Sequence, residues 1–211
     1  MHPILLWLTT PVLAVDIQAD LHLDTPTQLY RRQAKLDDAG MEAGLPQLRA
    51  GGINLAVEVL WPPRDAEWEA HTSRLLDIVE REDRRLDGVE IVTTPGDARR
   101  VADKGGVGLL LALEGAHGLG SGGAGALQAL RARGLSMLGL TWSFSNRYAG
   151  SSGDDGGGMT VEGWWLLAEA NRLGVVLDVS HASDQATMLA CGWSHAPVVA
   201  SHSNTDGRRP H

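Results

Sequence analysis

A nearly continuous apolar run, Val107–Leu113, constrains the fold of this chain more than any other feature. A strand that is hydrophobic on both faces is buried on both faces, which is typical of a parallel sheet covered by helices. Five further strand-like runs lie at about 15–24, 52–60, 135–141, 175–180 and 197–201, with a shorter extended piece at 89–93. Helical segments separate most of these runs, so the pattern predicts an α/β fold with a parallel sheet.

Two segments carry the clearest helical signals. In the segment from Asp65 to about Arg85, apolar residues recur at helical spacing and charges fill the other face. The segment Val161–Leu173 is followed directly by Gly174, a residue that commonly ends helices. The alternation of strands and helices fits both an open doubly wound sheet and a (β/α)8 barrel, although six strands are two fewer than a closed barrel needs.

The overall composition excludes several classes of protein. The 211 residues carry a net charge of −8 with no long basic run, which argues against a nucleic-acid partner. A hydrophobic share of 43% and a charged share of 21% are typical of a globular chain, which we interpret as one domain over residues 1–211. The single cysteine, Cys191, excludes an internal disulfide.

The N-terminal residues 1–14 are mostly apolar. They are too short to span a bilayer. Because no Lys or Arg precedes the apolar residues and no clear cleavage site follows them, we interpret this segment as a buried leader into the first strand rather than a secretory signal. The composition of the chain makes the cytoplasm the default location, with secretion and the periplasm as alternatives. The glycine-rich stretch 150–158 predicts a flexible loop.

Polar residues follow the predicted strands at the points where the strands end. His22 and Asp24 close the first run, Glu114 closes the third, and His181 and His202 follow the last two. In parallel α/β folds the carboxyl ends of the strands converge on one face, where active sites lie. Imidazoles and carboxylates are the ligands that zinc prefers after thiolates. The sequence therefore predicts a metal site at this edge of the sheet.

Other polar residues and motifs have plainer interpretations. His117 and His195 are interpreted as hydrogen-bonded loop residues, and Glu58 as a structural or supporting group. Asp178 precedes His181 by three residues, so a regular strand would place the two on opposite faces. The glycines at 118–123 match a dinucleotide-binding pattern, but no acidic residue ends the next strand, so they are interpreted as a loop. No G-x-S-x-G sequence supports a serine hydrolase.

Five strings resemble, in order and spacing, the membrane dipeptidase family (renal dipeptidase-like, peptidase family M19). They are DLHLDTP (20–26), LLLALEGAHGL (109–119), LTWSFSNRYAGSS (140–152), GVVLDVSHAS (174–183) and PVVASHSNTDGRRPH (197–211). The resemblance covers nearly all of the chain from about residue 16. It implies a (β/α)8 TIM barrel of the amidohydrolase type, here incomplete with about six of the eight strands.

The resemblance also implies a site and a reaction. His22 and Asp24 match the ligands of a first zinc ion, Glu114 matches the carboxylate that bridges two zinc ions, and His181 and His202 match the ligands of the second. The implied reaction is hydrolysis of the peptide bond of a dipeptide by a bridging water that the metals activate. Family members are often dimeric, so a homodimer is one assembly that the resemblance suggests.

The chain departs from the family pattern in two places. Trp142 stands where the mammalian enzymes have a histidine that contacts the substrate, which makes Trp142 a candidate substrate-binding residue. The sequence ends at His211, before the family's substrate-binding arginine, its last two strands and a catalytic aspartate. We therefore expect a C-terminally truncated chain with little or no dipeptidase activity. The alternatives are a non-catalytic remnant or metal-binding fragment, and a different amidohydrolase-type deacylase.

Overall fold

The computed structural model describes residues 16–64, 67–154 and 156–204. The expected N-terminal leader and Asp65, the first residue of the expected helical segment, lie outside these residues. In the part of the chain that the structure describes, no helix is both long enough and apolar enough to cross a membrane.

All the strands of the described chain belong to one parallel sheet. They are β1 (Ala19–Leu23), β2 (Leu55–Leu60), β3 (Val89–Ile91), β4 (Val107–Leu113), β5 (Leu135–Gly139), β6 (Val176–Asp178) and β7 (Val198–Val199). Their order is β1-β2-β4-β5-β6-β7, and β3 pairs with the beginning of β4. Each of the six predicted strand-like runs contains one strand of this path, which confirms the parallel α/β prediction.

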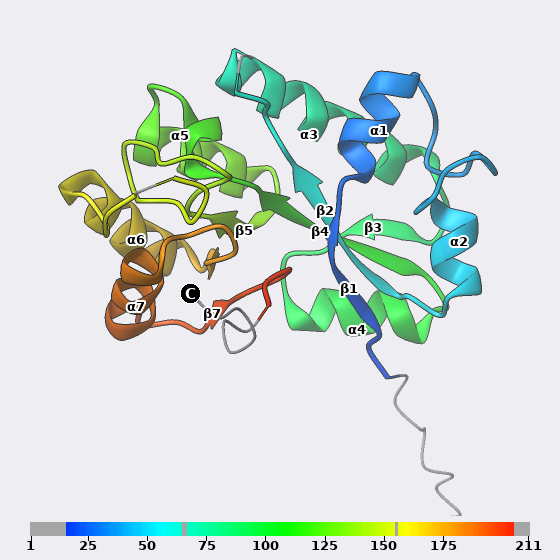
Figure 1. Cartoon of the computed structure of the whole chain (residues 1–211). Coiled ribbons are helices and arrows are strands. Elements are labelled where there is room, and N and C mark those ends of the chain that lie inside the picture. The colour runs from blue at the N-terminus through cyan, green and yellow to red at the C-terminus, as the bar shows by residue number, and fades with distance from the viewer. Residues whose placement is uncertain (1–15, 65–66, 155, 205–211) are drawn as a thin grey trace, which may run out of the picture.

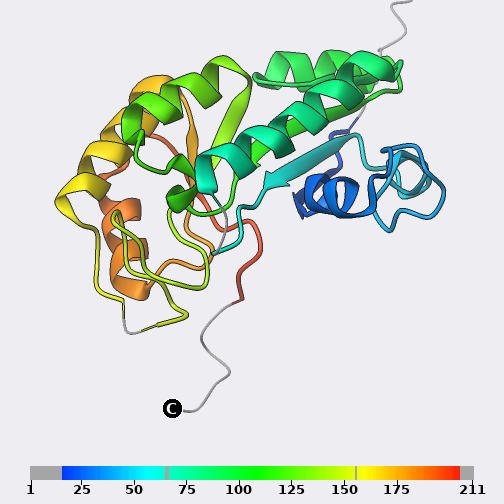
Figure 2. The same cartoon turned by 90° about the horizontal axis from the view of Figure 1, so that it is seen from above.

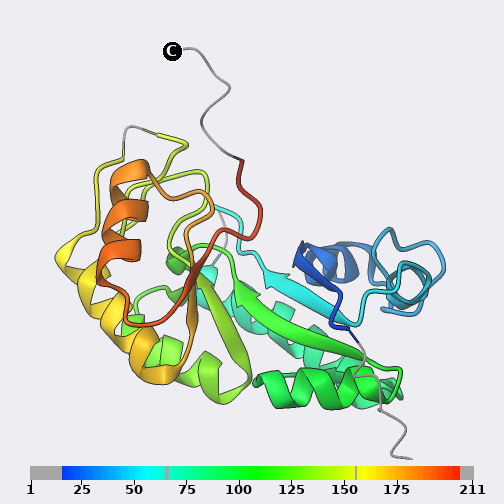
Figure 3. The ribbon, with the colours of Figure 1, turned by 90° about the horizontal axis from the view of Figure 1, so that it is seen from below.

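The helices follow the outer side of the sheet. They are α1 (Thr25–Arg32), α2 (Leu45–Ala50), α3 (Trp68–Arg85), α4 (Pro95–Asp103), the 3-10 helix η1 (Ala116–Leu119), α5 (Gly123–Ala132), α6 (Val161–Leu173) and α7 (Asp184–Trp193). Figure 1 shows the strands fanning through the centre of the molecule. Figures 2 and 3 show α3 to α6 along one side of a curved sheet, the arrangement of an incomplete barrel.

Strand β4 is buried on both faces, as its unbroken apolar run predicts. Leu109, Leu111 and Leu113 point into the main core, which they share with the buried leucines of α3, α5 and α6. Ala112 points to the opposite, inner face, where it packs with Val57 and Val59 of β2. Burying one leucine side chain contributes about 1.5–3 kcal/mol to the stability of the fold, so the leucines of β4 supply much of the free energy that packs the helices against the sheet.

The start of α1 and the whole of α2, both in the N-terminal half of the chain, were not predicted. α1 begins at Thr25, directly after Asp24, with Pro26 in its first turn. Proline is favoured there because its missing N–H has no intrahelical partner in any case. The short helix α2 also lies outside the predicted elements. α6 matches its prediction, and Gly174 ends it in the left-handed conformation with φ 68°.

The described residues of the glycine-rich stretch at 150–158 form the predicted loop, and they pack closely against their neighbours. Ser151 is fully buried, donates a hydrogen bond to the Trp142 carbonyl at 2.6 Å, and pairs with Ala182. A Cβ atom on Gly150 would lie 1.9 Å from the Gly157 carbonyl oxygen. The missing side chains therefore allow a close backbone approach here.

Candidate metal centre

Glu114 lies at the centre of the site because strand β4 delivers it there. It is the first residue after β4, and its backbone N–H donates to the Leu60 carbonyl at 3.1 Å, which continues the pairing with β2. The residue is 8% exposed. A carboxylate in this position faces the end of the sheet with little access to water.

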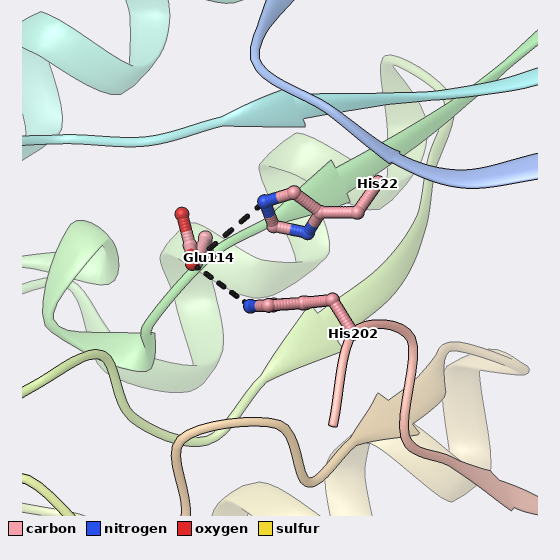
Figure 4. A group of neighbouring side chains, drawn as sticks. All are labelled: His22, Glu114 and His202. Atoms are coloured by element: carbon pink, nitrogen blue, oxygen red, sulfur yellow. Dashed lines mark ion pairs between the residues drawn. The ribbon is translucent and has the colours of Figure 1, made fainter. Parts of the chain in front are cut away.

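His22 reaches Glu114 from β1, the first strand of the sheet path. Side chains alternate along a strand, so His22 faces the site while Leu23 packs against the main core. The Nε2 atom of His22 lies 3.9 Å from Glu114 Oε1. Figure 4 shows the His22 ring and the His202 ring directed at the same carboxylate.

His181 follows β6 in an unusual backbone conformation. Its φ is 66°, in the left-handed region that residues with a side chain rarely adopt. Ser152 of the loop after Gly150 holds this turn, because the His181 carbonyl accepts hydrogen bonds from Ser152 N at 2.8 Å and Ser152 Oγ at 3.2 Å. His181 Nε2 then lies 3.0 Å from Glu114 Oε1. A strained backbone held by its neighbours is common at functional sites.

His202 completes the cluster from the other end of the sheet path. It follows β7, and its Nε2 lies 3.5 Å from Glu114 Oε1 and 2.9 Å from His181 Nε2. Its ring centroid is 3.8 Å from that of His22. The first and last strands of the path therefore meet at their carboxyl ends, which requires the sheet to curve. The ligand atoms of His22, Glu114 and His202 all lie within 4.8 Å of one another.

The electrostatics leave Glu114 ionised. Burial by itself would raise the pKa of Glu114, but the imidazoles of His181, His202 and His22 beside its carboxylate outweigh burial and lower it to about 2. Burial lowers the pKa of His22 below 6.5, although Glu114 opposes this. His202 differs, because the Glu114 carboxylate 3.5 Å from its Nε2 atom raises its pKa. At neutral pH the site thus presents a carboxylate beside a neutral His22.

Asp24 lies at the edge of this cluster, outside the group whose ligand atoms are within 4.8 Å. Loss of hydration and the nearby charge of Glu114 raise the pKa of Asp24, while His22 and His202 lower it. Asp24 also occupies the cap position of α1, yet its side chain makes no capping hydrogen bond. Its carboxylate is therefore not committed to the helix.

Trp142 lies beside the cluster on an aromatic wall. Its ring centroid is 6.5 Å from that of His181 and 5.0 Å from that of Trp61. His117 is buried, and its Nε2 donates to the Pro62 carbonyl at 2.9 Å, in agreement with a structural role. His195 is exposed. Asp178 was not among the predicted site residues, because a regular strand would place it on the face opposite His181. Strand β6 ends at Asp178, so this alternation does not extend to the turn that carries His181.

The donor set fits zinc. Two imidazole nitrogens and a carboxylate oxygen within 4.8 Å of one another are ligands of the kind that zinc takes, and metal ligands must be deprotonated to bind. The ionised Glu114 and the neutral His22 meet that requirement without further change. Without a bound cation, the neighbouring imidazoles around one buried carboxylate would bring nitrogen lone pairs or positive charges close together, which costs electrostatic free energy.

The fold and the site together define a class: parallel α/β barrel proteins with a candidate metal centre at the carboxyl ends of the strands. The family model of the membrane dipeptidases, peptidase family M19, matches residues 9–211. The chain belongs to this family of metallopeptidases.

The chain is also similar to individual proteins that are named dipeptidases. The dipeptidase verJ of Clonostachys rogersoniana is 29% identical over 174 residues, which cover 76% of this chain and 45% of verJ. The structure of dipeptidase AC, a metallopeptidase of family M19, has a TM-score of 0.80 at 25% identity and covers 90% of this chain and 65% of its own.

A metallopeptidase from Rhodobacter sphaeroides, liganded with a phosphinate mimic of the dipeptide L-Ala-D-Ala, shares the fold. It has a TM-score of 0.78 at 24% identity and covers 90% of this chain and 66% of its own. The chain thus spans less than half of verJ and about two thirds of the chains in these two structures.

Proposed function

We propose that this chain carries the metal-binding half of a zinc-dependent dipeptidase. The observation that carries the proposal is the convergence of His22, His181 and His202 on the single buried carboxylate of Glu114. The chain's membership of a metallopeptidase family and its likeness to proteins named dipeptidases support the same reading.

Five residues would hold two zinc ions. His22 and Asp24 would bind the first ion, His181 and His202 the second, and Glu114 would serve both. When bound, the ions would supply activation of a bridging water molecule and polarisation of the scissile carbonyl. The buried position of Glu114 would keep bulk water away from the ligand atoms and so strengthen their electrostatic interactions.

Trp142 is the proposed substrate contact. Its half-buried ring lies between the His181 ring and the Trp61 ring, so a dipeptide at the cluster would meet an aromatic wall. Apolar contact with such a wall would orient the substrate side chain without taking part in bond cleavage. Replacement of Trp142 by alanine should therefore raise KM more than it lowers kcat.

The proposal is tested first by metal binding. The purified 211-residue chain and its Glu114→Gln variant are titrated with zinc in competition with a chromogenic chelator. About two zinc ions per wild-type chain are expected, with weaker binding in the variant because a neutral amide replaces the bridging charge. Glu67→Gln, at an exposed position ahead of α3, serves as the matched control and should bind like the wild type. A wild-type chain that binds no zinc refutes the proposal.

Hydrolysis separates the candidate functions. Turnover of free dipeptides that a chelator abolishes and zinc restores supports the dipeptidase and contradicts the expectation that this chain is inactive. Zinc binding without hydrolysis of any substrate favours the metal-binding fragment. Hydrolysis of N-acyl amino acids in preference to dipeptides favours the deacylase. Size-exclusion chromatography with light scattering on the same samples tests the expected homodimer.

A further inference from the structure

We infer that Asp178 and Ser201 are positioning residues that fix the tautomer of His202 and so direct its Nε2 atom into the metal centre. The inference rests on the proposed function for its consequence, zinc affinity. The tautomer itself is a property of the metal-free protein.

Asp178 is a buried carboxylate at the end of β6, and it has three donors. Its Oδ1 accepts the backbone N–H of Ser180 at 2.9 Å and that of Ser201 at 3.2 Å. Its Oδ2 accepts the hydroxyl hydrogen of Ser201 at 2.5 Å. Asp178 is only 5% exposed, so these bonds replace the water that its carboxylate oxygens would contact at the surface.

The hydroxyl of Ser201 links the carboxylate of Asp178 to the ring of His202. A serine hydroxyl has one hydrogen to donate and two lone pairs to accept with. Because the hydrogen goes to the carboxylate of Asp178, the contact of 2.8 Å between Ser201 Oγ and His202 Nδ1 must place the hydrogen on Nδ1. A neutral imidazole with its proton on Nδ1 has a free lone pair on Nε2.

The free Nε2 is the atom that faces the cluster. It lies 3.5 Å from Glu114 Oε1, whereas Nδ1 faces Ser201 on the opposite side of the ring. Metal-binding histidines usually donate their other ring N–H to a carboxylate, carbonyl or water, which fixes both tautomer and orientation. Here one hydroxyl stands between the carboxylate and the imidazole.

The same residues also tie together the turns that carry two histidines. The backbone N–H of His202 donates to Ser180 Oγ at 3.2 Å, and Ser180 directly precedes His181. Asp178 pairs with Val199 in the sheet, so its carboxylate lies where β6 and β7 both end. The buried carboxylate of Asp178 therefore holds the turn after β6 and the turn after β7 by hydrogen bonds to the backbone.

Ser201→Ala tests the inference, with Ser201→Thr as the conservative variant that keeps the hydroxyl. Ser203→Ala is the matched control, because the Ser203 hydroxyl contacts Ser180 Oγ at 3.3 Å and lies outside the path to His202. Nitrogen-15 NMR of the imidazole side chains at about pH 9, where histidines are neutral, gives the tautomer in metal-free protein. Chelator competition then gives zinc affinity.

We expect the proton of His202 on Nδ1 in the wild type, Ser201→Thr and Ser203→Ala, and a shift towards Nε2 in Ser201→Ala. Zinc affinity should fall about 10- to 100-fold in Ser201→Ala alone. A wild-type proton on Nε2, or unchanged zinc affinity in Ser201→Ala, would overturn the inference. If the wild type binds no zinc, the proposed function fails, and the dependence of the tautomer on Ser201 alone decides whether the positioning holds.

Discussion

Glu58 offers a sharp test of the physical reasoning because it is an acid buried away from the metal centre. It alternates along β2 with Val57 and Val59, which face the inner side, and so it faces the helices near Thr25 of α1. The side chain is 2% exposed and its Oε1 has no hydrogen-bond partner. Burial raises the pKa of Glu58 from 4.5 to about 8, although Thr25 offsets part of the effect.

The raised pKa makes folding depend on pH. In the unfolded chain Glu58 ionises above pH 4.5, whereas in the folded protein it stays protonated up to about pH 8. The folded state then binds the proton more tightly, so the free energy of unfolding is highest below pH 4.5 and falls as the pH rises towards 8. Each pH unit in this interval costs about 1.4 kcal/mol, which amounts to about 3 kcal/mol at pH 7.

Glu58→Gln removes this cost, because an amide does not ionise. Urea unfolding followed by circular dichroism near pH 5 and near pH 8 gives the free energy of unfolding of both proteins. The variant should gain about 3 kcal/mol on the wild type between these pH values. Any constant penalty for the new amide cancels in that comparison. Glu67→Gln, at an exposed glutamate, should show no such gain. Parallel pH dependence of wild type and Glu58→Gln would refute the reasoning.

Two further predictions concern the metal and a buried ion pair. Zinc at about 100 times its dissociation constant should stabilise the chain by about 2.7 kcal/mol, seen as a rise in melting temperature that a chelator reverses; an equal rise in Glu114→Gln would contradict the assignment of Glu114. Glu82, 1% exposed, accepts hydrogen bonds from Leu36 N and Arg85. Glu82→Ala should therefore cost about 3 kcal/mol in urea unfolding, and Glu82→Gln less, because its carbonyl can still accept from Leu36; equal losses would exclude the hydrogen bond as the cause.

Local patterns in the sequence were sufficient to predict most of the strands and several of the helices. The apolar run of β4 predicted a strand buried on both faces, and the spacing in α6 with Gly174 after it predicted the end of that helix. These signals work because side-chain periodicity and backbone preferences act within a few residues.

The sequence by itself determined the identity of the polar residues at the strand ends, and the five motifs it contains determined the family. Only the tertiary structure decided that His22 and His202, near opposite ends of the described chain, lie with their ring centroids 3.8 Å apart beside Glu114. That contact depends on the curvature of the sheet, which arises from the packing of many residues far apart in sequence. The hydrogen bonds from Asp178 through Ser201 to His202 depend on it too, because no local pattern specifies which turn two separate strands will share.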